Sequence, residues 1–370
     1  DNRMRYRLID SPLTRTLIGL GLFLQGQQPI PTDWDWSKSW TENKLAGSLP
    51  SPDVLLAARW SVAWLFPLSC IFLFLITKKI GGSGSAVIAL ILFSSNALIL
   101  LHTRRAMAEG ALICFLCASV WALMTINKRA WLAAIPIGLS INAKQTTFPL
   151  AGIGLFHVLF QPDILERKRS RILQTVFFLF VVLTISWILN PVFWKSPAEA
   201  LDTGIAFRND LSGRMEVDYH SSSNFLDQTA KLIGQVFIQP PAIADVQNYR
   251  DKTKIQQENY LRQPLNNLFR GLWTGAFFLG LTIFGWLILV RRVFSHQPTT
   301  RYPMIMFLII TMITMLVIIL YTPVSFQRYY VILIPLFIVA QSVALNALGL
   351  AINHYYKEKR ATRFGQPSQN

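Results

Sequence analysis

The chain has 370 residues, of which 52% are hydrophobic and only 15% are charged, and its formal net charge is +16. A soluble domain carries about a quarter charged residues, so this composition excludes an ordinary soluble protein and predicts an all-α polytopic membrane protein. The positive charges lie beside apolar runs and form no single basic arm, which argues against nucleic acid as a partner.

The N-terminal segment, residues 1–53, is polar, rich in tryptophan and interrupted by proline. Its exception is the apolar run Pro12–Gly26, which is too short and too interrupted by polar residues to cross a membrane. Asp10 and Ser11 before this run offer an N-cap, and Pro12 suits the first turn of a helix. The pattern therefore predicts an interfacial helix that lies on the membrane surface.

Nine apolar runs of roughly membrane-spanning length follow, separated by short polar breaks. The two runs on either side of Lys144 are short for a bilayer at about 1.5 Å per residue, so we expect them to be tilted, re-entrant or shielded by neighbours. The predicted spans are Val54–Thr77, Ala86–Leu101, Ala108–Ile126, Ala130–Ala143, Thr146–Phe160, Ile172–Leu189, Gly271–Val290, Tyr302–Tyr321 and Tyr329–Leu350.

Alternate breaks between these runs are rich in lysine and arginine, which makes them cytoplasmic by the positive-inside rule. The N-terminus is then outside and the C-terminus cytoplasmic, in a plasma membrane or a membrane of the endoplasmic reticulum type. Residues 190–270 are too polar to span and are predicted to cap the helices, with a weak helical pattern at Leu226–Phe237. The predicted domains are an outer loop 1–53, helices 54–189, the outer cap 190–270, helices 271–350 and a cytoplasmic tail 351–370.

The short outer loops should be poor in cations, yet they contain several. One interpretation is that each side chain reaches out to the lipid headgroups, as lysine and arginine do at the ends of spans. Several such loops on one face of the membrane also suit a ligand that combines a phosphate with a lipid tail. The predicted substrate-binding residues are Arg59, Arg104, Arg105, Lys144 and Arg328.

Glu109 follows Arg105 by one helical turn, so an ion pair within the helix is one interpretation. The other is a carboxylate that binds a metal ion or positions a sugar, and periodicity does not separate the two. His220 lies in the predicted cap, where a lone histidine is more often solvated than catalytic. His102 and His157 are interpreted as polar residues at the ends of spans.

Five motifs in a fixed order now point to a family. They are Asp10–Leu13, Ala57-Ala58-Arg59, the sequence HTRRAMAE at His102–Glu109, Gly138–Leu150 and Phe326–Leu336. In order, spacing and common sidedness, the chain resembles the GT-C membrane glycosyltransferases. The resemblance is to the group of protein O-mannosyltransferases and aminoarabinose transferases, which use polyprenyl-phosphate sugar donors.

The resemblance implies a GT-C-like bundle that moves a sugar from a polyprenyl-phosphate carrier to an acceptor on the outer face of the membrane. In such proteins Lys144 and Arg328 match basic positions near the donor phosphate. Glu109 matches an acidic residue that in some members helps to form a metal or acceptor site. A divalent metal ion is therefore the candidate cofactor, with Glu109 and His220 as its candidate ligands.

The chain departs from this family in one respect. The family's catalytic Asp-Glu pair lies in the first outer loop, upstream of the position of Asp10, and the nine residues before Asp10 contain no such pair. We therefore expect a preceding span and loop that this sequence lacks, and take Asp10 and Glu109 as substitute candidates for catalysis. The missing pair also favours a non-catalytic GT-C-like subunit of a larger membrane complex.

A transporter is a third interpretation of a bundle of apolar helices that carries charged residues. Transporters often show inverted repeats and charges near the middle of the membrane. Here the charges gather at one face and no internal repeat is visible, which counts against this interpretation.

Overall fold

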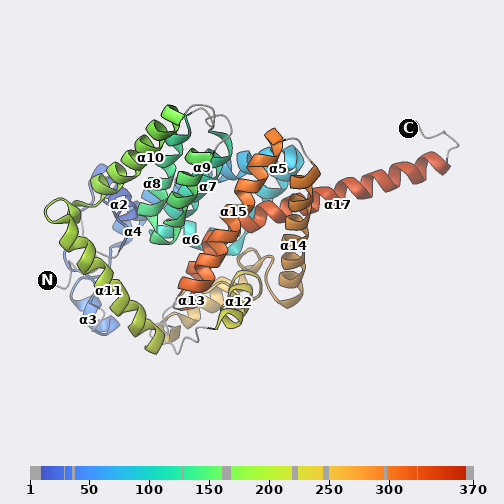
Figure 1. Ribbon diagram of the computed structural model, residues 1–370. Helices are drawn as coiled ribbons and strands as arrows, with labels where there is room; N and C mark the ends of the chain where they lie inside the picture. Colours follow the sequence, from blue (N-terminus) through green and yellow to red (C-terminus); the bar gives the residue numbers. More distant parts are fainter. Residues whose placement is uncertain are drawn as a thin grey trace.

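A computed structural model describes residues 10–28, 30–35, 38–126, 129–160, 168–218, 224–244, 250–295, 298–322 and 324–363. All the regular elements in these ranges are helical (Figure 1). The α-helices are α2 (Leu13–Leu24), α3 (Trp40–Leu45), α4 (Pro52–Ala63), α5 (Leu65–Ser95), α6 (Ala97–Thr103), α7 (Ala108–Thr125), α8 (Ala134–Ala143), α9 (Pro149–Phe160), α10 (Lys168–Leu189), α11 (Pro197–Asp218), α12 (Phe225–Ile233), α13 (Arg250–Arg262), α14 (Leu272–Ser295), α15 (Pro298–Tyr321), α16 (Gln327–Tyr330) and α17 (Ile334–Arg363).

Six helical stretches in the described part of the chain are long and apolar enough to cross a membrane, which supports an integral membrane protein. The predicted count of nine spans is not confirmed. The first predicted span and the start of the second lie within one helical stretch, Pro52–Ser95, and the second continues into α6. The two predicted spans around Lys144 form the shorter apolar helices Ala130–Ala143 and Gln145–Phe160. The apolar runs are therefore helical as predicted, but only some of the helices are long enough to cross a membrane.

Helix α5 doubles back on itself. The rings of Phe66 and Phe93 stack with their centroids 5.6 Å apart, whereas an unbroken helix would separate these residues by about 40 Å. The reversal occurs at Gly82, whose φ of 81° lies in the left-handed region that glycine adopts without steric cost. Arg292 of α14 donates a hydrogen bond of 3.1 Å to the Ile80 carbonyl next to this turn. Two of the breaks predicted to be cytoplasmic thus meet at one end of the bundle.

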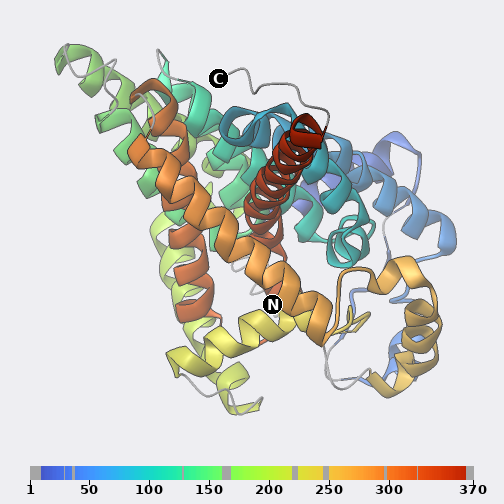
Figure 2. The same ribbon diagram turned by 90° about the vertical axis from the view of Figure 1, so that its right-hand side faces the viewer.

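Helix α7 is the centre of the bundle. It packs against α5, α8 and α15, and most of its side chains are buried. Helix α17 packs against α5 and α14, while α10 lies at the periphery with much of its apolar surface exposed. Residues 348–360 of α17 are exposed, and this end projects away from the bundle toward the viewer in Figure 2. The helix continues to Arg363, so it does not end at the predicted boundary near residue 350.

Two glycines of α14 provide a matched test of the contact between α14 and α17. A Cβ at Gly285 would lie 2.0 Å from the Ala340 carbonyl oxygen, whereas a Cβ at Gly280 would meet nothing within 4 Å. Gly285→Ala is expected to destabilise the protein by about 1–3 kcal/mol, the usual cost of overpacking, because the backbone at Ala340 must move to make room. Gly280→Ala is expected to stabilise it by up to about 1 kcal/mol through helix propensity. Thermal unfolding in detergent micelles measures both, and equal effects of the two variants would contradict the close approach of α17.

Residues 190–270 contribute α11, α12, a π-helical turn at Gly234–Ile238 and α13, which gather at one end of the bundle (Figure 1). The predicted helical pattern at Leu226–Phe237 corresponds to α12 and this turn. Buried Arg270 donates to the backbone carbonyls of Gln235 and Val236, and to that of Gln239 at 2.5 Å. Its guanidinium therefore satisfies carbonyls that the end of a helix leaves without partners.

The Gln327 side chain ties the same segment to the start of α16. It accepts a hydrogen bond of 2.7 Å from the Ala242 backbone N–H and donates to the Pro240 carbonyl at 3.2 Å. The region after the π-helical turn is thereby fixed next to Arg328, the following residue.

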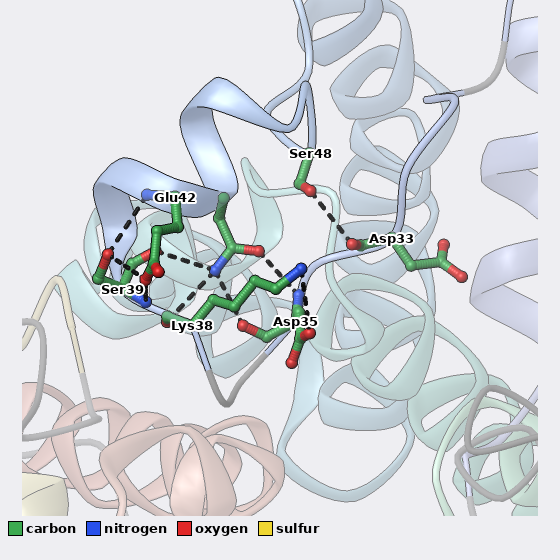
Figure 3. A network of polar contacts seen from close by, with 7 residues as sticks. Asp33, Asp35, Lys38, Ser39, Glu42 and Ser48 are labelled. Carbon is green, nitrogen blue, oxygen red and sulfur yellow. Dashed lines mark hydrogen bonds and ion pairs between the residues drawn. The ribbon is translucent and has the colours of Figure 1, made fainter.

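The N-terminal segment contains the predicted helix as α2, which packs on α4. The predicted cap differs: Pro12 is the N-cap residue without a side-chain hydrogen bond, and the Ser11 hydroxyl instead donates to the Ile141 carbonyl of α8 at 3.4 Å. The buried Asn43 side chain accepts from the Asp35 backbone N–H and donates to the Asp35 carbonyl, both at 2.8 Å. The Ser48 hydroxyl donates to the Asp33 carbonyl at 3.1 Å (Figure 3). Local hydrogen bonds from polar side chains thus hold the backbone around Asn43.

Candidate functional site

A buried ion pair lies where the helices end on the side of the cap. The Lys144 Nζ is 2.9 Å from the Glu109 Oε1, and the side chains are 19% and 3% exposed respectively. Glu109 stands in the first turn of α7, and Lys144 is the C-cap residue of α8. The pair therefore joins two helices through residues that are 35 positions apart in the sequence.

The ends of these two helices favour the charges that they carry. The N-terminus of α7 presents unpaired N–H groups and a positive dipole end to the Glu109 carboxylate, and the C-terminus of α8 presents carbonyls to the Lys144 ammonium. Lys144 leaves the helix with an extended backbone (φ −160°, ψ 132°), which separates α8 from the short helix Gln145–Thr147. Helix termini thus offset part of the cost of removing both charges from water.

A tyrosine ring lies beside two cations at this pair. The Lys144 Nζ is 5.0 Å from the Tyr329 ring centroid, and the Arg328 Cζ is 5.3 Å from the same centroid. Arg328 also lies 5.5 Å from the ring of Phe326. Cation–π attraction holds positive groups over aromatic faces without neutralising them. The Tyr329 ring thus lies next to both the Arg328 guanidinium and the Lys144 ammonium, which pairs with Glu109.

His102, in the last turn of α6, and Arg105, in the loop that precedes α7, lie near the pair. The His102 ring is fully buried, and among the described residues neither of its nitrogens has a hydrogen-bond partner. Burial is the main cause that lowers the pKa of His102 to about 4, although the Glu109 carboxylate opposes this. The cations that face it lower the pKa further; they are Arg105, Lys144 and Arg328. The imidazole is therefore neutral at pH 7.

Asp10 interacts electrostatically with Arg328. Burial raises the pKa of this carboxyl, and the charges of Arg15, Arg208 and Arg328 oppose the rise. Arg15 also donates a hydrogen bond of 3.0 Å to the Asp10 backbone carbonyl. A carboxylate of raised proton affinity and a basic cluster thus share one region.

Arg208 belongs to this region and was not predicted from the sequence. It lies on α11 of the cap and donates to the Gln145 side-chain oxygen, next to Lys144. No sequence signal distinguishes it, because its neighbours Asp202, Asp210 and Arg214 give α11 the charge pattern of an ordinary exposed helix. Tyr329 was also missed, although its position beside Arg328 at the start of a helix was visible in the sequence.

The predicted site residues are only partly brought together. Glu109, Lys144, Arg328 and Arg105 surround His102, and Asp10 faces Arg328. Glu109 pairs with Lys144, which belongs to another helix. This contact therefore differs from the ion pair with Arg105 that one interpretation placed within a single helix. Two predicted residues lie elsewhere: Arg104 bonds the Leu100 carbonyl and contacts Tyr260 of α13 at 3.5 Å, and Arg59 is exposed on α4.

The proposed metal site does not fit the residues that the structure describes. Glu109 is engaged by the Lys144 ammonium, and His220 lies outside the described residues. In the described part of the chain, no group of three or more His, Cys, Asp or Glu side chains is arranged to hold a metal ion. No step of the chemistry below is therefore assigned to a metal.

No family model and no curated sequence matches the chain. The solved structures that resemble it include three of an oligosaccharyltransferase from Archaeoglobus fulgidus. The AglB complex with an inhibitory peptide and a dolichol-phosphate is 14% identical at a TM-score of 0.50, and the alignment covers 99% of this chain and 48% of that chain. The complex with Zn and sulfate is 12% identical at a TM-score of 0.51, and the alignment covers 93% of this chain and 41% of that chain. The apo form is 14% identical at a TM-score of 0.51, and the alignment covers 97% of this chain and 44% of that chain.

At such identities the likeness shows the fold alone, and the chain spans less than half the length of these structures. The expected GT-C architecture is supported at this coarse level, while the mannosyltransferase and aminoarabinose-transferase group is not confirmed. The chain is an all-α membrane protein whose helical bundle is similar to that of the GT-C oligosaccharyltransferases.

Proposed function

We propose that the chain is a membrane glycosyltransferase that moves a sugar from a polyprenyl-phosphate carrier to an acceptor on the outer face of the membrane. The observation that carries the proposal is the cluster at the cap side of the bundle, where buried Lys144 pairs with Glu109 and shares the Tyr329 ring with Arg328. Charged groups held at the end of membrane helices commonly mark a substrate pathway.

The cluster suits the leaving group of such a reaction. When the glycosidic bond breaks, negative charge develops on the carrier phosphate, and fixed cations in a water-poor site stabilise it. Lys144 and Arg328 supply two such charges, and Arg208 beside Gln145 supplies a third from the cap. The apolar helices below them offer a medium for the polyprenyl tail. A dolichol-phosphate bound to the similar AglB structure supports this assignment.

The acid–base role falls to Asp10. Glu109 is 3% exposed and held by Lys144, so it is poorly placed to accept a proton from an incoming acceptor. The Asp10 carboxyl is partly shielded from water, which raises its proton affinity above that of an ordinary aspartate, and it lies within reach of the Arg328 charge. A carboxylate in this position suits a general base that takes the proton of the acceptor hydroxyl or amine.

Asp10→Asn tests this role. The variant is expected to slow sugar transfer about 100- to 10,000-fold, the usual contribution of a general base, while donor affinity changes less than about threefold because the cations remain. The assay follows radiolabelled sugar from a polyprenyl-phosphate hexose in proteoliposomes of the full chain, with host membrane extract as the source of acceptors.

Asp202→Asn is the matched control, because Asp202 is an exposed aspartate on cap helix α11. It is expected to leave transfer unchanged. Equal losses in both variants would contradict the assignment of Asp10. Donor binding without any transfer by the unmodified chain would contradict the enzyme and favour a non-catalytic structural subunit.

A further inference from the structure

One buried group at the site has no role in the chemistry above. His102 ends α6 with an exposed fraction of 0%, and in the described part of the chain its Nδ1 and Nε2 atoms both lack a hydrogen-bond partner. A buried polar group without a partner is unfavourable, so the presence of His102 calls for a state in which its ring is hydrogen-bonded. An imidazole can gain such a state by taking up a proton and a counterion.

The groups around His102 decide its charge. Glu109 of α7 faces it and favours the imidazolium. The opposing cations come from three other elements: Arg105 from the loop before α7, Lys144 from the end of α8, and Arg328 from α16. In this arrangement Glu109 is already neutralised by Lys144 at 2.9 Å, so the cations and burial prevail and the ring stays neutral.

We propose that His102 is the proton acceptor of a charge exchange at this site, gaining one proton from solvent when an anionic phosphate binds to Lys144 and Arg328. This inference rests on the proposed function, since it takes the phosphate of the carrier as the ligand. His102 acts through Glu109 and is a positioning residue, not one that touches the reacting atoms.

Three effects of the phosphate act in the same direction. It adds negative charge near the ring, it offsets the charges of Lys144 and Arg328, and it draws the Lys144 ammonium away from Glu109. Glu109 would then be a buried carboxylate without a counterion, which is strongly unfavourable. A protonated His102 supplies the missing counterion, so the pair Glu109–Lys144 is replaced by Glu109–His102 and the lysine is released to the phosphate.

The test uses farnesyl methyl phosphate, a phosphodiester whose single charge does not change between pH 5 and pH 9. Calorimetric titration of the full chain at pH 6, in two buffers of different ionisation enthalpy, measures the protons taken up per ligand. If the pKa of His102 recovers to its ordinary value of about 6.5 in the complex, uptake of about three-quarters of a proton is expected at pH 6. Affinity should then rise about tenfold between pH 8 and pH 5.5.

Variants assign the proton to a residue. His102→Gln is expected to bind the probe without uptake and without the pH dependence. His354→Gln, which removes an exposed histidine on the projecting end of α17, should behave like the unmodified chain. Asp10 is another titratable group near Arg328, so Asp10→Asn separates it from His102 as the group that takes up the proton. Uptake that persists in His102→Gln or vanishes in Asp10→Asn would overturn the inference.

The remaining outcomes also decide. If His102→Gln does not fold, the affinity of the unmodified chain and of Asp10→Asn across pH gives the answer: a flat profile overturns the inference, and a tenfold rise that Asp10→Asn retains supports it. Binding without proton uptake overturns this inference and leaves the proposed function intact. Absence of binding to the phosphodiester overturns both.

Discussion

Replacing Lys144 by methionine is expected to lower the free energy of unfolding by about 3–5 kcal/mol and to abolish measurable binding of a polyprenyl phosphodiester. The stability loss arises because Glu109, 3% exposed, becomes a buried charge without a partner. The binding loss arises because the phosphate loses one of its proposed cations. Thermal unfolding in detergent micelles and calorimetric titration measure the two effects on the same preparation.

The double variant Lys144→Met with Glu109→Gln separates structure from function. Replacing a whole buried ion pair by neutral groups of similar volume is often neutral or stabilising, so stability should return to within about 1 kcal/mol of the unmodified chain. Binding should stay lost, because the cation is still absent. A double variant that regains both stability and binding would show that Lys144 serves the fold alone.

Arg328→Gln is expected to weaken binding of the phosphodiester by roughly 10- to 100-fold, in line with about 1.5–3 kcal/mol for a hydrogen bond to a charged group. Arg328→Lys should recover little of this affinity. The guanidinium is planar and lies 5.3 Å and 5.5 Å from two aromatic rings, an arrangement that a flexible ammonium does not reproduce.

Arg59→Gln is the matched control for Arg328. Arg59 is an exposed arginine on α4, and its replacement should change affinity less than about twofold. A similar loss in both variants would indicate a general attraction of the positive surface for anionic lipid. No loss in Arg328→Gln would indicate that its side chain only reaches for the headgroups.

The sequence predicted which segments are helical with good accuracy, and the reason is local. In an apolar medium each backbone N–H and C=O must find its partner within the segment, so a long apolar run such as Tyr302–Tyr321 has little alternative to a helix, and α15 covers it. The positions at which a helix bends or ends were less predictable, because they depend on single residues. Gly82 reverses α5 in one residue, whereas no residue ends α17 near position 350.

The candidate site was likewise predicted only in part from the sequence. The sequence placed Glu109, Lys144 and Arg328 in short breaks of the same sidedness, since breaks of an alternating bundle return to the same face at every second turn. It left the partner of Glu109 open between Arg105 and a ligand, and the structure supplies Lys144 from another helix. It also grouped Arg104 with the site, while that side chain bonds α6 and contacts Tyr260 of the cap.

What the sequence alone determined about this protein is its membrane class, its helices and the end of the bundle at which charges gather, because these follow from hydrophobic length and from charge in loops. Only the tertiary structure decided which charges meet. The contacts of Lys144 with Glu109 and Tyr329, and of Arg208 with Gln145, join elements far apart in the chain. Such pairings depend on how distant helices pack, and neither periodicity nor composition records that packing.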